Sequence, residues 1–380
     1  MKKTLALFSI LSLLSINHIA EAKDAKQKET PKNTTVKKET PKEDLSSKVF
    51  DAIKSGNVEL LKNILNRKVD LNQKKDVSDY QKGYTPLLYA VELANKEMVS
   101  ILLEKGANPN IVDDFGYGIL MKVFDFELAE MLINKGLDVN SKNNMGQTPI
   151  MYTFTEDIYE LLLEKGADVN AKDNEGKTPV MYAFNEDALE LLIAKGAKLD
   201  VKDNNGKTPL MYSPSKEVAK ILVEKGADVN ARDNSGKTPL IYSYNKELSE
   251  YLIEKGADVN AKDKDGTTAL LNTFDKRIAA LLIEKGADIN AKSSYGSTPL
   301  LNAMNKKMVS FLISKGADIN GVNNDGQTLL MITNDKKIVE YLLLKGADVN
   351  IKDKYGKTAL DYAKDYNRTA IAKLLENFSK

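Results

Sequence analysis

The sequence predicts an all-α repeat solenoid, built from helix-turn-helix units that are joined by β-hairpin-like loops. Two series of glycines, each with one glycine every thirty residues, are the first evidence: one runs from Gly116 to Gly356, the other from Gly106 to Gly346. With Gly83, the two series hold 19 of the 22 glycines, so glycine marks fixed positions in a repeat. Such a repeat is one supersecondary unit that buries its apolar face only by stacking on its neighbours.

Residues 1–22 have the three-part pattern of a secretory signal peptide. A Met-Lys-Lys start, typical of bacterial signals, precedes an apolar stretch over residues 4–16 and the small-residue sequence Ala-Glu-Ala at 20–22. Thirteen helical residues span about 20 Å, less than the roughly 30 Å of a bilayer's hydrocarbon core. An uncleaved membrane anchor is the alternative. We expect cleavage after Ala22, export to the periplasm or the medium, and no membrane span in the mature chain.

Residues 23–44 are expected to form a disordered, lysine-rich linker. The segment has one large aliphatic residue, Val36, and repeats the sequence Lys-Glu-Thr-Pro-Lys. A stretch of this composition buries too little apolar surface to offset the entropy of ordering it. An electrostatic tether to the cell envelope is an alternative interpretation of the lysines, but a solvated spacer explains them more simply.

Composition excludes several kinds of chemistry. The 380 residues contain no cysteine and one histidine, His18, so Ser-His-Asp catalysis, Cys-His catalysis and the usual zinc ligands are missing from the mature chain. We therefore expect no enzyme activity, no metal and no cofactor. Residues 1–22 hold two of the 55 basic and one of the 54 acidic residues, which leaves 53 of each. Without a basic excess, the chain is not expected to bind nucleic acid.

Residues 173–202 show how each unit is built. Thr178 and Pro179 begin a first helix that continues over residues 180–184, because Thr caps helix N-termini and Pro is tolerated at the first helical position. Asn185 caps a second helix with apolar residues at helical spacing, and a lysine and a glycine end it. The residue matching Asn185 is of a capping type in eight consecutive units: Asp125, Thr155, Asn185, Ser215, Asn245, Asp275, Asn305 and Asp335.

The strings GQTPIMY, GKTPVMY and GKTPLMY, followed by text such as LLLEKGADVNAKD, resemble the ankyrin repeat. The resemblance covers residues 45–380 and implies about eleven units: a capping unit at about 45–78, a 33-residue unit at about 79–111, eight 30-residue units over 112–351 and a C-terminal capping unit over 352–380. Each central unit lacks three residues between its helices, so its first helix should lose most of a turn. Residues such as Met181 replace the family's histidine, so apolar packing is expected to hold the stack together.

A column of tyrosines is the first candidate binding surface. Tyr152, Tyr182, Tyr212 and Tyr242, with Tyr89 before them, occupy one position of the first helix in their units. At about 100° per residue, this position lies roughly 200° from the core residue two places earlier, so the rings should leave the main core. Packing between repeats and a binding stripe are the two interpretations.

The residue before each turn glycine is the second candidate, because it varies along the chain. These residues are Phe115, Met145, Glu175, Asn205, Ser235, Asp265, Tyr295, Asp325 and Tyr355. In the ankyrin family, hairpin tips and first helices line the concave face that binds partners. The resemblance thus implies that Phe115, Met145, Tyr295 and Tyr355 are exposed apolar contacts. Drift at unconstrained turns is the alternative explanation for the polar members.

These observations favour a non-catalytic, exported and monomeric protein that binds another protein through its concave face. A cell-envelope glycan-binding protein, with the tyrosines as stacking platforms, is the alternative.

The acidic loops do not follow the EF-hand calcium pattern: in the best case, Asp263 and Asp265 precede Gly266, but Ala261 occupies the first ligand position.

Overall fold

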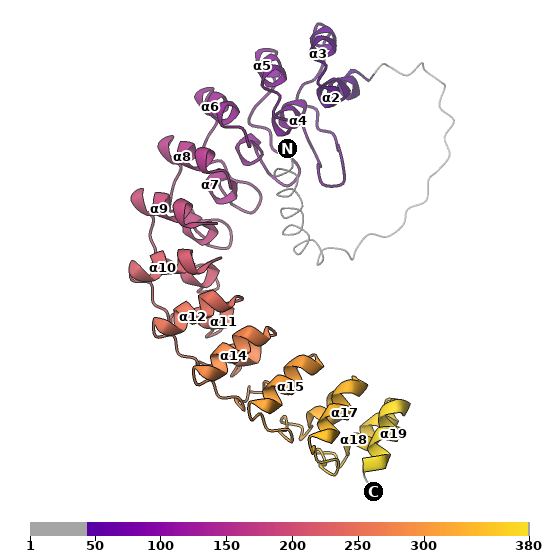
Figure 1. The fold of residues 1–380 in the computed structure, drawn as a ribbon. Helices are drawn as coiled ribbons and strands as arrows, with labels where there is room; N and C mark the ends of the chain where they lie inside the picture. The colour runs from indigo at the N-terminus through magenta and orange to yellow at the C-terminus, as the bar shows by residue number, and fades with distance from the viewer. Residues whose placement is uncertain (1–43, 379–380) are drawn as a thin grey trace, which may run out of the picture. The chain divides into compact units, whose positions relative to one another are not determined.

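The computed structural model describes residues 44–378, and Figure 1 shows their fold. The chain divides into two units, Met1–Asp44 and Leu45–Lys380, and every described helix belongs to the second. The expected signal peptide (residues 1–22) and linker (residues 23–44, Asp44 excepted) lie outside the described residues.

Helices follow one another along the whole second unit. The N-terminal part contains α2 (Leu45–Ser55), α3 (Val58–Leu65), α4 (Pro86–Glu92) and α5 (Lys96–Glu104). The first helices of the central units are short, and some are 3-10 helices, denoted η. They are η1 (Ile119–Met121), α7 (Pro149–Tyr152), η2 (Pro179–Tyr182), η3 (Pro209–Tyr212), α11 (Pro239–Tyr242), α13 (Ala269–Asn272) and α16 (Leu329–Ile332). Residues 299–302 form a turn at the same position in their unit.

Second helices of the central units are longer and more regular. They are α6 (Phe126–Asn134), α8 (Glu156–Glu164), α9 (Glu186–Ala194), α10 (Lys216–Glu224), α12 (Lys246–Glu254), α14 (Lys276–Glu284), α15 (Lys306–Ser314) and α17 (Lys336–Leu344). The last unit consists of α18 (Ala359–Asp365) and α19 (Thr369–Phe378). None of the helices within residues 44–378 has both the length and the apolar character needed to span a bilayer.

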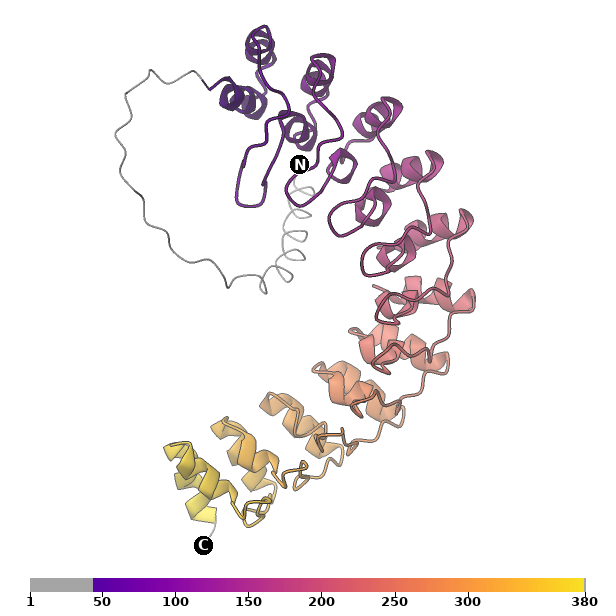
Figure 2. The same ribbon diagram turned by 180° about the vertical axis from the view of Figure 1, so that it is seen from behind.

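The expected all-α repeat solenoid is confirmed. Successive helix pairs of the second unit stack into one curved row, and in both Figure 1 and Figure 2 α4 and α7 lie on its inner side, with α5, α6 and α8 on its outer side. Residues 44–378 contain no named strand, only isolated bridges such as Lys75 with Tyr84. The loops between units are tight turns, in which Asp173 N donates to Lys177 O at 3.0 Å.

The core is a continuous row of aliphatic side chains. One leucine from each second helix is at most 1% exposed: Leu132, Leu162, Leu192, Leu222, Leu252, Leu282, Leu312 and Leu342. Residues at the position of the family's histidine are buried as well, with Met151 3% and Met181 6% exposed. Apolar packing therefore fills the place where a histidine network would lie, as expected from the sequence.

The shortened units change the connection between their two helices. The first helices α4 and α18 have seven residues and lead into left-handed residues, Ala94 (φ 52°) and Asn367 (φ 54°). Those of the central units have three or four residues and, as at Thr153 (φ −80°, ψ 142°), mostly lead into extended backbone. The three missing residues are thus accommodated by replacing a helical turn and a left-handed residue with an extended connection.

All eight residues of the second-helix capping column occupy the N-cap position, and seven accept a hydrogen bond from the first helical turn. Thr155 is the exception. Thr178 occupies the N-cap position of the first helix η2, as expected, but its side chain accepts no capping hydrogen bond. Its hydroxyl is buried without a partner, because Met181 N bonds the Thr178 carbonyl instead at 2.9 Å.

Candidate protein-binding surfaces

The tyrosine column is hydrogen-bonded to the hairpin loops. The hydroxyl of Tyr212 donates to Oδ2 of Asp203 at 2.6 Å, and the same bond recurs in the pairs Tyr182–Asp173, Tyr242–Asp233 and Tyr362–Asp353. Burial of the ring, together with the bond to Asp203, raises the pKa of Tyr212 above its ordinary value. The hydroxyls are therefore neutral donors that are already engaged within the chain.

Lysine side chains cover the faces of these rings. Lys207 Nζ lies 5.4 Å from the ring centre of Tyr212 and 4.2 Å from that of Tyr242, while Lys177 Nζ lies 5.1 Å from Tyr212. An ammonium group over a ring face is an attractive contact. Lysines and tyrosines thus alternate from one unit to the next, and the column connects neighbouring repeats.

The other members of the tyrosine column have different surroundings. Tyr89 is 6% exposed and packs against Phe50, with ring centres 5.9 Å apart. Tyr152 is half-buried, and its ring centre lies 4.9 Å from that of Tyr117. The rings do leave the leucine row, yet none of the five tyrosines is fully exposed.

The hairpin tips hold exposed side chains on a fixed backbone. Tyr295 and Tyr355 are 70% and 69% exposed, and Phe115 and Met145 are 42% and 46% exposed. Of the polar tip residues, Asp325 is half-buried and the others are exposed: Glu175, Asn205, Ser235 and Asp265. The backbone carbonyl of the tip accepts an N–H from the next unit, as at Met145 O, where the Asn174 N–H donates at 2.9 Å.

Asparagine side chains add a second set of connections between loops. Asn174 Nδ2 donates to Asn144 O, and Asn204 Nδ2 donates to Asn174 O, both at 3.0 Å. The turn glycine permits this approach, because a Cβ built on Gly176 would lie 2.5 Å from Asn204 Oδ1. The tips are consequently held in register along the stack.

A third surface, which the sequence analysis missed, lies between the two helices of each central unit. We call it the inter-helix edge. Its apolar row is formed by the residue before the second-helix N-cap in seven of the eight central units, and the eighth unit has Asn334 there. The seven residues are Phe124, Phe154, Phe184, Pro214, Tyr244, Phe274 and Met304. Met304 is 77% exposed, Tyr244 64% and Phe274 60%. The extended connection turns five of these side chains outward, whereas Phe184 and Pro214 are half-buried and Phe184 packs against the core.

Phe184 shows why this row was overlooked. The sequence analysis assigned it to the first helix over residues 180–184, but η2 ends at Tyr182 and Phe184 lies in the extended connection. Its ring centre lies 5.6 Å from that of Phe154 in the preceding unit. The thirty-residue spacing of aromatics beside the capping column was the signal that could have revealed the edge.

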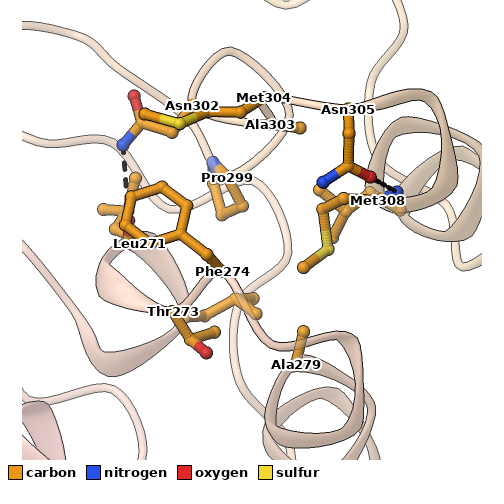
Figure 3. A pocket seen from close by; sticks show the side chains of 12 residues that line it. Leu271, Thr273, Phe274, Ala279, Pro299, Asn302, Ala303, Met304, Asn305 and Met308 are labelled. Atoms are coloured by element: carbon orange, nitrogen blue, oxygen red, sulfur yellow. Dashed lines mark hydrogen bonds between the residues drawn. The ribbon is translucent and has the colours of Figure 1, made fainter. Parts of the chain in front are cut away.

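The inter-helix edge contains an apolar cleft of about 140 Å³ between α13, α14 and the start of α15. Figure 3 shows Phe274, Pro299 and Met308 turned toward the same space. The two amide side chains in view are engaged within the chain: Asn302 Nδ2 donates to Leu271 O at 3.3 Å, and Asn305 Oδ1 accepts from Met308 N at 3.0 Å. The cleft is therefore suited to an apolar side chain.

Comparison with known proteins identifies the repeat. A family model described as "Ankyrin repeats (3 copies)" matches residues 49–113, 120–203, 184–263, 244–323, 267–353 and 305–379. Repeats of this family typically serve as non-catalytic scaffolds for protein–protein interaction. Within residues 44–378, no group of three or more acidic side chains is arranged to hold a metal ion.

Curated relatives match over short segments. The human protein named "Ankyrin repeat, SAM and basic leucine zipper domain-containing protein 1" is 34% identical over 79 residues, 21% of this chain and 16% of the relative. Proteins of the same name from Notamacropus eugenii and Mus musculus are 43% identical over 70 residues (18% of this chain, 14% of the relative) and 32% identical over 79 residues (21% and 16%). The chain thus spans 14–16% of the length of these relatives. The family model, by contrast, covers nearly all of the solenoid, and the chain belongs to the ankyrin-repeat family.

Proposed function

We propose that this chain is an exported binding protein that recognises another protein through its row of hairpin tips. The support is a combination of exposure and rigidity. Tyr295 and Tyr355 expose about 70% of their surface, while the Tyr295 carbonyl accepts a hydrogen bond of 3.2 Å from Asn324 N in the next unit. Varied side chains on a backbone that is already ordered bind with a smaller entropy cost than side chains on a flexible loop.

The test replaces Tyr295→Ser together with Tyr355→Ser in the mature chain. Because both rings are exposed, the double variant should keep the wild-type free energy of unfolding within about 0.5 kcal/mol. It should lose the partners that wild type captures from an envelope fraction. Leu344→Ser is the control, since Leu344 is 77% exposed but lies at the C-terminal end of α17, outside both the tips and the inter-helix edge. Unchanged capture by a folded Tyr295→Ser, Tyr355→Ser variant would refute the tip surface.

Export is the second part of the proposal and has its own measurement. Protein recovered from the envelope or the medium should begin at Lys23, as intact mass or N-terminal analysis would show. Recovery of the chain in a membrane fraction with Met1 still present would favour the membrane anchor instead.

Glycan binding through the tyrosine column has less support. A stacking platform needs a free ring face, whereas Lys207 lies over both Tyr212 and Tyr242, and the two hydroxyls donate to aspartates. Sedimentation with purified cell-wall glycan separates the two functions. Co-sedimentation of wild type that is lost in a folded Tyr212→Ser variant, which has no ring, would support the glycan interpretation instead.

A further inference from the structure

The inter-helix edge changes its charge along the stack. Counted over the N-cap and the first two helical residues, the net charge is −2 at each of α6, α8 and α9. It is zero at α10 and α12, and then +1, +2 and +1 at α14, α15 and α17. At α8 the acidic residues are Glu156 and Asp157, and at α15 the basic residues are Lys306 and Lys307, all exposed.

The acidic half is explained by helix stability, but the basic half is not. Carboxylates stabilise the positive end of a helix dipole, whereas lysines at the first helical positions destabilise it. Three consecutive helices carry this unfavourable arrangement, with basic pairs at 276–277, 306–307 and 336–337. This unfavourable interaction with the helix dipole recurs in three units. We infer from this that the basic residues have a role other than stabilising the fold.

The charges at the centre of each half, at α8 and α15, form no ion pair with another described residue. No ion pair joins Lys306 or Lys307 to an acid among residues 44–378, and none joins Glu156 or Asp157 to a base. The units beside them differ, because Lys96 pairs with Asp125 of α6 at 3.0 Å and Arg277 pairs with Asp275 of α14 at 2.6 Å. Glu156 accepts a hydrogen bond from Asn185 Nδ2 at 3.3 Å, and Lys306 Nζ lies 5.8 Å from the ring centre of Tyr341. Both clusters nevertheless stay exposed and can meet an opposite charge on another molecule.

We propose that a second copy of this chain supplies the opposite charge, with two copies packed antiparallel along the inter-helix edge. The charge series reverses its sign about the boundary between α10 and α12, and its non-zero magnitudes match only for α8 (−2) and α15 (+2). A two-fold axis at this boundary places α8 of one copy opposite α15 of its partner, and α9 opposite α14. Such an interface uses the same surface patch on both copies, as two-fold dimers do.

The same axis also pairs apolar side chains. It sets Phe154 opposite Met304, Phe184 opposite Phe274, and Pro214 opposite Tyr244. The apolar cleft beside Phe274 then receives an apolar side chain from the partner copy. Burial of this row supplies association energy, while the charges select the antiparallel orientation over the parallel one. The hairpin tips take no part in the contact, so this proposal and the tip proposal can fail separately.

The test uses sedimentation equilibrium of the mature chain and two charge variants. One variant carries Glu156→Lys and Asp157→Lys, and the other carries Lys306→Glu and Lys307→Glu. Each variant alone places like charges opposite each other, so its dissociation constant should rise by about tenfold or more. An equimolar mixture restores opposite charges at both symmetric contacts and should associate as wild type does. Circular dichroism of each variant checks that the repeats remain folded.

Salt and a matched control complete the experiment. Association of wild type should weaken between about 0.1 M and 1 M salt, as the Debye length falls from roughly 10 Å to 3 Å. Lys195→Glu with Lys225→Glu reverses two exposed charges away from the edge and should leave association unchanged. A wild-type chain that stays monomeric at low salt overturns the proposal. The proposal is also overturned if an equimolar mixture of the two edge variants does not associate.

Disulfide trapping tests the register, since the chain has no native cysteine. Phe154→Cys with Met304→Cys should give a covalent dimer on mild oxidation. Phe154→Cys with Tyr244→Cys, which the antiparallel pairing keeps apart, should give little. Equal trapping by both double variants would contradict the proposed register.

Discussion

The hydroxyl of Tyr212 lies 2.6 Å from Oδ2 of Asp203, the residue that opens the hairpin loop of the same unit. Asp203 is 6% exposed, and its Oδ1 accepts the backbone N–H groups of Asn205 and Lys207, both at 2.8 Å. One carboxylate therefore holds the hairpin turn and the first helix together. Packing between repeats, one of the two interpretations of the tyrosine column, therefore describes the contacts of Tyr212.

Tyr212→Phe should lower the free energy of unfolding by about 1–3 kcal/mol, because it leaves a buried carboxylate oxygen without its donor. Urea unfolding of the single variants and of the double variant with Asp203→Asn should give a coupling of about 0.5–3 kcal/mol. Tyr295→Phe, at an exposed tip, is the control and should change little. A coupling near zero would mean that the bond does not contribute to stability.

The two glycine series should respond differently to alanine. Gly206 (φ 77°) and Gly226 (φ 94°) both have positive φ, but a Cβ on Gly226 meets nothing within 4 Å, whereas one on Gly206 would lie 2.4 Å from Asn234 Oδ1 and 2.8 Å from Asn234 N. Gly226→Ala should cost about 1–2 kcal/mol for the left-handed conformation alone. Gly206→Ala should cost about 1–3 kcal/mol more, because the next unit must shift. Thermal or urea unfolding measures the loss in the free energy of unfolding for each variant. Equal losses for Gly206→Ala and Gly226→Ala would contradict the role of Gly206 in stacking.

Reversing lysines at helix starts should stabilise the monomer. Lys307→Glu and Lys337→Glu exchange an unfavourable for a favourable charge at the N-termini of α15 and α17, a gain of about 0.3–1 kcal/mol each at low salt. Lys315→Glu, at the C-cap of α15, should instead destabilise the chain by a similar amount. Urea unfolding at low protein concentration measures both effects. A gain in stability with a loss of self-association would show that the two properties conflict at these positions.

The C-terminal unit should lose stability in acid through Asp361. The backbone N–H and the hydroxyl of Thr358 donate to Asp361 Oδ2, both at 2.8 Å, and these bonds lower the pKa of Asp361. Because the folded-state pKa lies below the unfolded value of roughly 3.9, this stabilisation is complete above that pH and is lost as the pH falls through the folded pKa.

Asp361→Asn should therefore be less stable than wild type at neutral pH by about 1 kcal/mol, and the difference should shrink in acid. Hydrogen exchange of amides in α18 and α19, measured at several pH values, follows this unit. If the difference in stability between wild type and Asp361→Asn stays constant below pH 4, the Asp361 carboxylate is not its source.

The sequence by itself determined the repeat, the order of the helices and the caps of the second helices, because these depend on interactions within a few residues. Asn185 caps α9 and Gly226 takes positive φ as the local pattern predicts. The hydrogen bonds between the tyrosine column and the hairpin loops also correlate with residue types in the sequence. Where the loop residue is Asn143 instead of an aspartate, the residue four places later is Gln147, which donates to the hydroxyl of Tyr182 in the next unit at 3.0 Å.

Only the tertiary structure decided which aromatic side chains face solvent. Tyr212 and Phe274 are both aromatic and lie within two residues of each other in the repeat, yet the ring of Tyr212 packs between lysines and Phe274 is 60% exposed. The difference arises because Tyr212 ends its helix beside the neighbouring loop, while Phe274 lies in the extended connection that replaces three missing residues. The direction of such a side chain depends on the backbone path and on the adjacent repeat, and neither can be read from residue types along one unit.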